Sequence, residues 1–165
     1  MSSVDAVDGW TPPSASERRT LIAEARSIAI VGASSNRGRA SHFVATYFLS
    51  SSADLDVYLV NPHETEILDQ PVYPSLDALP EPPDIVDVFR REDHLPDVAE
   101  EAAAARCRTF WAQLGLWSVP AADIAVRAGM KVVMNRCLKI EHARFHGGLH
   151  LAGFDTGVLS SRRTR

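Results

Sequence analysis

Short runs of apolar, often β-branched residues recur along the chain, separated by segments whose apolar positions follow a helical spacing. The first run, Ser27–Gly32, ends in glycine and has the character of a strand buried on both faces. The runs with the same character that follow it are Leu55–Val60, Asp84–Phe89, Thr109–Leu114 and Lys131–Asn135. Strands that alternate with helices require right-handed crossovers and form a mainly parallel sheet. The pattern therefore predicts an α/β fold with five strands.

Helices are predicted between these strands and at both ends of the series. Ser14 and Glu17 have the spacing of a capping box, which predicts a helix from there to about Arg26. Ser118 is expected to cap another helix, with proline in its first turn. That helix is expected over Pro120–Ala128, and the remaining helices over Ser41–Leu49, Pro96–Arg106 and Leu138–Phe145. The proline-rich interval His63–Pro83 interrupts the alternation, and we expect only a short helix there, near Ser75–Leu79.

The length and composition fit one domain. The chain has 165 residues, of which 45% are apolar, enough to fill one hydrophobic core. The first residues are polar and end in proline, so we expect a loosely ordered arm over residues 1–13, a domain over residues 14–145 and a tail over residues 146–165.

Charge and composition exclude several classes of protein. The net charge is −4 and the sequence pI is about 5.8, which argues against a general nucleic-acid binder. No apolar stretch is long enough to cross a bilayer, and the first residues do not form a signal peptide. Two cysteines, Cys107 and Cys137, cannot form a disulfide framework. We therefore expect a cytoplasmic protein without membrane or nucleic-acid partners.

The residues that follow the first strand suit a phosphate. Ligands of open parallel sheets bind outside the carboxyl ends of the strands, so the residues that follow each strand are the candidates for ligand binding. Gly32 permits a tight turn, Ser34 and Ser41 supply hydroxyl groups, and the helix that follows offers free backbone N–H groups. Arg37 and Arg39 add positive charge. The loop is neither GxGxxG nor a Walker A phosphate loop, so its own signal is weak.

Each of the other predicted strands also ends in a polar or cationic residue. Asn61 stands where an NAD site usually has a carboxylate, and a neutral side chain there tolerates a ligand phosphorylated on its adenosine ribose. Phe89 can cover an adenine, and Arg90 follows it. Gln113 and the pair Asn135–Arg136 can bind ribose, amide or phosphate groups. Together the strand ends predict a site for a phosphorylated adenosine ligand.

Five segments then make the sequence recognisable. They are Ile30–Ser34, Val60–Pro62, Asp87–Arg90, Trp111–Gly115 and Met134–Cys137 with Glu141. In this order they resemble the small CoA-binding domain proteins, single-domain Rossmann-like relatives of the nucleotide-binding domain of the succinyl-CoA synthetase alpha subunit. The resemblance covers about Ser27–Glu141. It implies a doubly wound, three-layer fold with a five-stranded parallel sheet, and coenzyme A bound across the strand ends.

The resemblance and the strand ends together define a candidate site, with the diphosphate expected near Gly32–Ser34 and Ser41. The predicted ligand-binding residues are Gly32, Ala33, Ser34, Arg39, Ser41, Asn61, Pro62, Phe89, Arg90, Gln113, Gly115, Asn135 and Arg136. No catalytic residues and no metal ligands are assigned. The hypothesis is a non-catalytic or regulatory module that binds coenzyme A or an acyl-CoA.

Other functions stay open at this point. One is an NAD(P)-linked oxidoreductase, and another is a CoA-dependent enzyme component that works with a partner subunit. A metabolic enzyme or a second copy of the chain is a candidate partner. His142 and His146 have the i, i+4 spacing of helical metal ligands, but a role as ordinary helix residues is favoured. Cys137 is either a packed side chain or a thiol activated by Arg136.

Overall fold

A central sheet of seven strands organises the computed structural model, which describes residues 7–51 and 54–146. The strand order is β3-β4-β2-β1-β5-β6-β7, and all neighbours are parallel except β3 and β4. The strands are β1 (Ser27–Val31), β2 (Asp56–Val60), β3 (Glu66–Ile67), β4 (Gln70–Tyr73), β5 (Ile85–Val88), β6 (Thr109–Ala112) and β7 (Lys131–Val133). The predicted Rossmann-like α/β class is therefore confirmed.

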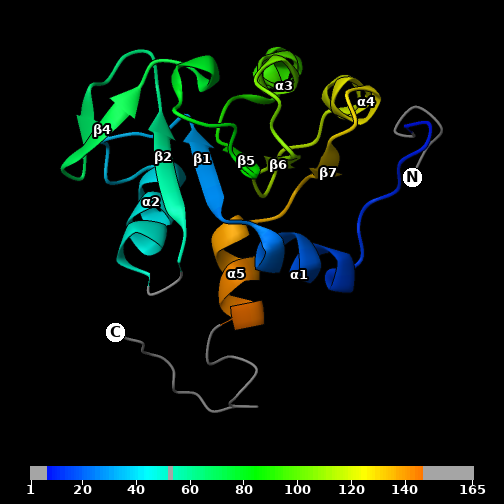
Figure 1. Cartoon of the computed structure of the whole chain (residues 1–165), viewed down its shortest axis with the longest axis horizontal. Helices are drawn as coiled ribbons and strands as arrows, with labels where there is room; N and C mark the ends of the chain where they lie inside the picture. The colour runs from blue at the N-terminus through cyan, green and yellow to red at the C-terminus, as the bar shows by residue number, and fades with distance from the viewer. Residues whose placement is uncertain (1–6, 52–53, 147–165) are drawn as a thin grey trace.

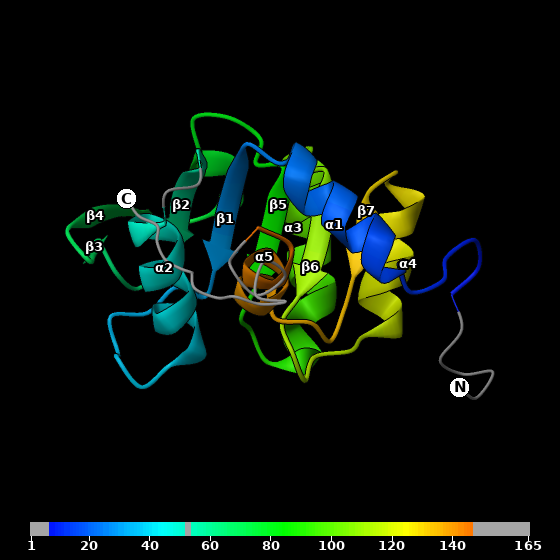
Figure 2. The same cartoon turned by 90° about the horizontal axis from the view of Figure 1, so that it is seen from below.

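Helices cover both faces of the sheet and make three layers. Helices α3 and α4 lie on one face, and α1, α2 and α5 lie on the other (Figures 1 and 2). Their bounds are α1 (Ala15–Glu24), α2 (Ala40–Ser50), α3 (Leu95–Ala104), α4 (Val119–Arg127) and α5 (Leu138–His146), with short 3-10 turns at Leu76–Ala78 and Glu92–His94. The expected caps are present, since Ser14 and Glu17 form a capping box and the Ser118 side chain accepts from the Ala121 N–H.

The predicted count of five strands is wrong, because the proline-rich interval holds two more. β3 and β4 form a hairpin there, and β4 joins the sheet in parallel with β2. The hairpin turns at Leu68 and Asp69, whose φ angles are 52° and 61°. A turn of this left-handed kind is usually marked by Asn-Gly or Asp-Gly, and Leu-Asp gives no such signal.

β1 is the centre of the fold, and all five of its residues are buried. The buried side chains form one cluster on each face of the sheet, because successive residues of a strand point to opposite faces. Ala29 and Val31 belong to the cluster under α3 and α4, and Ile28 and Ile30 belong to the cluster under α2 and α5. This two-sided burial explains the continuous apolar run in the sequence.

Part of the segment expected as a loosely ordered arm packs against the sheet. Val7 is buried, and Trp10 donates a hydrogen bond from Nε1 to the carbonyl oxygen of Val132 in β7. The Trp10 ring also contacts Trp117. The predicted tail lies outside the described residues, apart from His146. Among the described helices, none combines the length and the apolar character needed to span a bilayer.

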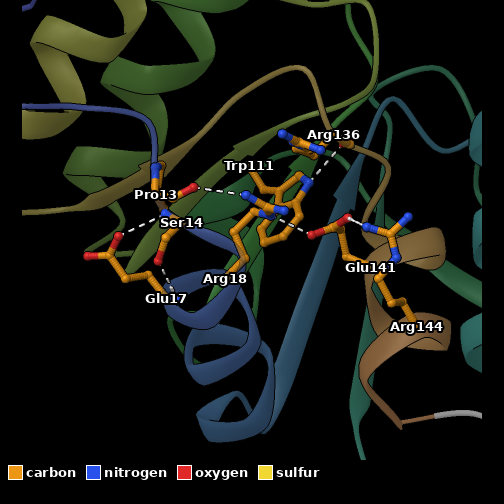
Figure 3. A network of polar contacts seen from close by, with 8 residues as sticks. All are labelled: Pro13, Ser14, Glu17, Arg18, Trp111, Arg136, Glu141 and Arg144. Carbon is orange, nitrogen blue, oxygen red and sulfur yellow. Dashed lines mark hydrogen bonds and ion pairs between the residues drawn. The ribbon is translucent and has the colours of Figure 1, made fainter. Parts of the chain in front are cut away.

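Buried charge holds α1 to α5 (Figure 3). Arg18 of α1 donates from Nε to Oε1 of Glu141 in α5, and from Nη1 to the carbonyl oxygen of Pro13 at 2.8 Å. The Arg18 and Glu141 side chains are only 7% and 3% exposed. Arg144, which is exposed, lies with its Nη1 atom 3.6 Å from the second carboxylate oxygen of Glu141. The first and last helices of the described chain are thereby joined across the sheet face.

Candidate functional site

A cleft opens at the carboxyl ends of β1, β2, β5 and β6. The chain passes from β1 to β2 on one side and later returns to β5 on the other side of β1, so the strand order reverses at β1. Such a switch point is where open α/β sheets bind ligands. The cleft has a volume of about 570 Å³ and collects residues from four loops. The fold therefore places a sizeable cavity where the sequence predicts the ligand.

Nine of the thirteen predicted residues line this cleft. They are Gly32, Ser34, Arg39, Ser41, Asn61, Pro62, Phe89, Arg90 and Gln113. The lining residues that the sequence analysis missed are Ala40, His63, Arg91, Leu114 and Leu116. Each of these lies within three residues of a predicted one, so a wider window at each strand end would have included them.

The four other predicted residues do not line the cleft. Ala33 is buried in the core. Asn135 is exposed, and its Oδ1 accepts a hydrogen bond of 2.7 Å from the N–H of Gly115. Arg136 is also exposed, and its carbonyl oxygen accepts from Nε1 of Trp111 at 2.9 Å (Figure 3). The turn after β7 thus bonds to the end of β6 rather than to the cleft.

Glycine is required at position 32 by the close approach of two strand ends. Gly32 has a φ of +90°, which side-chain-bearing residues rarely adopt. A Cβ atom there would collide with the carbonyl oxygen of Phe89 and press on the Arg90 side chain. The absence of a side chain therefore lets the end of β1 pass beside the end of β5 at the mouth of the cleft.

The N-terminus of α2 faces the cleft through Arg39, Ala40 and Ser41. Ser14 and Ser118 cap α1 and α4 with their side chains, but Arg39 makes no such bond at the start of α2. The first N–H groups of a helix lack intrahelical partners and carry a partial positive charge. This end of α2 is therefore suited to a phosphate group.

The cleft lining combines cationic and apolar side chains. Arg39, Arg90, Arg91 and His63 bring cationic and imidazole groups from the ends of β1, β5 and β2. Leu114 and Leu116, which follow β6, are apolar. A ligand that suits this lining carries both anionic groups and a less polar arm.

One side-chain atom in the cleft lacks a partner. Oε1 of Gln113 is buried and accepts no hydrogen bond from the described residues. An unpaired buried acceptor is costly, and a ligand N–H or O–H group would satisfy it. Both carboxylate oxygens of Asp87 in β5 are likewise unpaired among the described residues, but Asp87 is fully buried and does not line the cleft. Burial raises the pKa of Asp87 well above its ordinary value.

The polar groups of Ser34, which lines the cleft, bond within its own loop and to the helix that follows. The hydroxyl of Ser34 accepts from the N–H of Asn36 at 3.0 Å. The His42 ring lies 2.9 Å from the carbonyl oxygen of Ser34 and not from its hydroxyl. In serine nucleophiles the base must instead reach the hydroxyl. This contact therefore organises the loop.

The residues with alternative roles lie away from the cleft. Cys137 is buried at the start of α5, and His142 bonds to the hydroxyl of Tyr47 at 2.9 Å. The side chain of His146 lies outside the described residues. Within the described ranges, His, Cys, Asp and Glu form no group of three that could hold a metal ion.

The fold and the site define an α/β protein with a ligand cleft at its switch point, and comparison with known proteins gives the family. The chain matches the CoA binding domain over residues 26–143 and belongs to that family. It is 37% identical over 131 residues to the uncharacterized protein YneT of Bacillus subtilis (strain 168), covering 79% of this chain and 96% of that protein.

Solved structures of similar proteins have the same fold. A hypothetical protein from Pyrococcus horikoshii OT3 has 31% identity and a TM-score of 0.74, covering 88% of this chain and 99% of that one. The cell-free ID.343 protein from Thermus thermophilus has 33% identity and a TM-score of 0.74, covering 81% of this chain and 99% of that one. The predicted resemblance to small CoA-binding domain proteins is thus confirmed.

Proposed function

We propose that this chain binds coenzyme A or an acyl-CoA in the cleft as a non-catalytic or regulatory module. The observation that carries the proposal is the composition of the cleft at the switch point. It combines three arginines, the uncapped N-terminus of α2 and an apolar wall in one cavity. Membership of the CoA binding domain family supports the same ligand.

The residues fit the groups of coenzyme A. Arg39, Arg90 and Arg91 can form charge-assisted hydrogen bonds with phosphates, and arginine is suited to this because its N–H groups form a fork. The unpaired Oε1 of Gln113 can accept from an amide N–H of the pantetheine arm. The apolar side chains of Leu114 and Leu116 suit the rest of that arm. Bound coenzyme A would supply a thiol group, and the residues of the cleft would position it.

A binding role is favoured over catalysis by the contacts of the polar residues. Ser34 and His42 use their polar groups to bond within the loop, as described above. A general base must lie within hydrogen-bond reach of the proton that it removes. A regulatory role further requires a partner, for which we propose a metabolic enzyme or a second copy of this chain, in the cytoplasm.

Calorimetry with coenzyme A, dephospho-coenzyme A and NAD tests the proposal. We expect the tightest binding with coenzyme A, because the cleft has several cations and no carboxylate among its lining residues. No binding of coenzyme A, or equal weak binding of all three ligands, would refute the proposal. Tighter binding of NAD would instead support the oxidoreductase alternative.

Variants of single arginines test the assignment of the phosphate contacts. Arg90→Ala should weaken binding by about 1–3 kcal/mol, which is about 5- to 150-fold in Kd. Arg127→Ala is the matched control, because Arg127 lies in α4, pairs with Asp123 and is exposed. Arg136→Ala should also have little effect, since Arg136 does not line the cleft. A loss with Arg136→Ala equal to that with Arg90→Ala would show that the ligand extends beyond the cleft described.

A further inference from the structure

We propose that Asn61 and Glu64, in the loop after β2, are positioning residues that hold the β1–α2 loop (residues 32–39) in the shape that binds the ligand. Neither side chain needs to touch the ligand for this role. The inference rests on the proposed function for its binding test, but its structural part can be measured without a ligand. It differs from the prediction from sequence, in which Asn61 is a ligand-binding residue whose neutral side chain tolerates a phosphorylated ribose.

Asn61 uses both ends of its amide inside the protein. Its Nδ2 donates to the carbonyl oxygen of Ala33 at 2.7 Å, and its Oδ1 accepts from the N–H of His63 at 2.7 Å. Its own backbone N–H donates to the carbonyl oxygen of Tyr73 at 2.9 Å. Asn61 therefore joins three segments: the β1–α2 loop, its own loop and the end of β4. An aspartate here would have no N–H group to offer Ala33.

Glu64 holds the next part of the same loop. Its Oε2 accepts from the N–H of Ser35 at 3.0 Å. Hydrogen bonding with Ser35, first through its side chain and then through this N–H, lowers the pKa of the Glu64 carboxyl below its ordinary value of 4.5, and nearby His42 contributes. Ser34 lines the cleft, but Ser35 and Glu64 do not. The bond therefore lies outside the cleft lining, where it holds the loop without competing for a ligand.

The loop needs support from outside because its own contacts are short in range. Within it, the Asn36 N–H donates to the Ser34 hydroxyl and the Gly38 N–H donates to Oδ1 of Asn36. The start of the loop is tied to the sheet, where the N–H groups of Gly32 and Ala33 donate to the carbonyl oxygen of Val60, and Asn61 and Glu64 add contacts at Ala33 and Ser35. Ordering the backbone of a residue costs conformational entropy. Contacts from Asn61 and Glu64 remove that cost before the ligand binds, which is the benefit of preorganisation.

Substitutions of Glu64 separate support of the loop from the effect of charge. Glu64→Ala should weaken coenzyme A binding about 2- to 10-fold, the effect of one lost hydrogen bond. Glu64→Gln keeps an oxygen acceptor for Ser35 but loses the negative charge, so it should bind coenzyme A at least as tightly as the wild type. Glu66→Ala is the matched control, because it removes an exposed carboxylate two residues further on, in β3.

Asn61→Ala provides a second, independent test. It should weaken coenzyme A and dephospho-coenzyme A binding by the same factor, about 2- to 10-fold, because a positioning residue does not distinguish the ribose groups of the two ligands. A selective loss for one of them would mean that Asn61 contacts the ribose, and would overturn its role as a positioning residue.

Nuclear magnetic resonance of the ligand-free protein tests the same contact directly. The amide proton of Ser35 should follow the titration of the Glu64 carboxyl, with a midpoint below 4.5. The pH-dependent shift should vanish in Glu64→Gln, which has no titrating carboxyl. Amide hydrogen exchange of Ser35 should be faster in Glu64→Ala than in the wild type.

The outcomes distinguish this inference from the proposed function. If the wild type fails to bind coenzyme A, the proposed function fails, while the Ser35 amide still tests the support of the loop. If the wild type binds and Glu64→Ala binds equally well, the role of Glu64 is refuted. Tighter binding by both Glu64→Ala and Glu64→Gln would show that the carboxylate opposes the ligand, which also contradicts the inference.

Discussion

The buried ion pair between Arg18 and Glu141 allows a quantitative test of the fold. Both side chains are nearly inaccessible, at 7% and 3% exposure, and each belongs to a different helix. Removing one partner of such a pair leaves a buried charge uncompensated, which typically costs about 3–5 kcal/mol. Glu141→Ala leaves Arg18 with the carbonyl oxygen of Pro13, and Arg18→Ala leaves Glu141 with the exposed Arg144, 3.6 Å from its second oxygen. We expect either change to have a cost in this range.

The expected loss is large relative to the total stability of a domain, which is about 5–15 kcal/mol. For a chain of this length, about 3–5 kcal/mol corresponds to a decrease of about 6–20 °C in Tm. Urea denaturation followed by circular dichroism measures the free energy of unfolding, and a thermal scan measures Tm. Arg127 provides a matched control, because its ion pair with Asp123 spans 2.9 Å but is exposed at 79% and 42%. Arg127→Ala should cost less than about 1 kcal/mol.

A double variant separates the pair from its surroundings. Replacing both residues with apolar ones, Arg18→Met with Glu141→Leu, removes both charges together, and such replacements are often neutral or stabilising. The double variant should therefore be more stable than either single alanine variant. If the single alanine variants lose no more than Arg127→Ala does, burial does not set the cost of breaking this pair, and the reasoning is refuted.

Three other residues give predictions that follow from burial and backbone geometry. Gly32→Ala should destabilise the fold by about 2 kcal/mol or more, because it combines a φ of +90° with a collision at Phe89. Gly129→Ala is the control and should cost less, because Gly129 has a similar φ of +84° but open space around it. Urea denaturation measures the free energy of unfolding of both variants. Burial raises the pKa of Asp87 in the folded state, so its contribution to stability is complete below its ordinary pKa of 3.8 and is lost as the pH rises through the raised value. Asp87→Asn should therefore gain stability relative to the wild type as the pH increases. Equal slopes of the free energy of unfolding against pH in the two proteins would contradict this. Burial, with a smaller contribution from Glu101, raises the pKa of Cys107 to about 12, so iodoacetamide should modify this thiol, as seen by mass spectrometry, only when the protein unfolds.

The position of the site could be predicted from the sequence because of a general property of parallel sheets. The carboxyl ends of all parallel strands lie at the same edge, so residues that follow apolar runs were expected to meet there. Gly32, Asn61, Phe89 and Gln113 meet in this way. The helices were also predictable, since caps such as Ser118 are local signals.

The order of the strands could not be predicted, and it decides which strand ends reach the cleft. β7 is the edge strand of the sheet and is separated from β1 by β5 and β6. The turn that contains Asn135 and Arg136 therefore begins three positions away from β1, where its contacts are to Gly115 and Trp111. The same short apolar pattern is typical of a central strand and of an edge strand, so residues after β7 were predicted to bind the ligand on the same basis as residues after β1.

Asn61 shows why residue type predicts location better than role. A neutral residue at the end of β2 was predicted to matter because it does not repel a phosphorylated ribose, and it does line the cleft. In the structure its side chain donates to Ala33 and accepts from His63. An asparagine supplies a donor and an acceptor on one rigid group, which lets it bond to two loops at once. That bifunctionality accounts for asparagine at this position without any contact to the ligand, since aspartate lacks the donor and alanine lacks both.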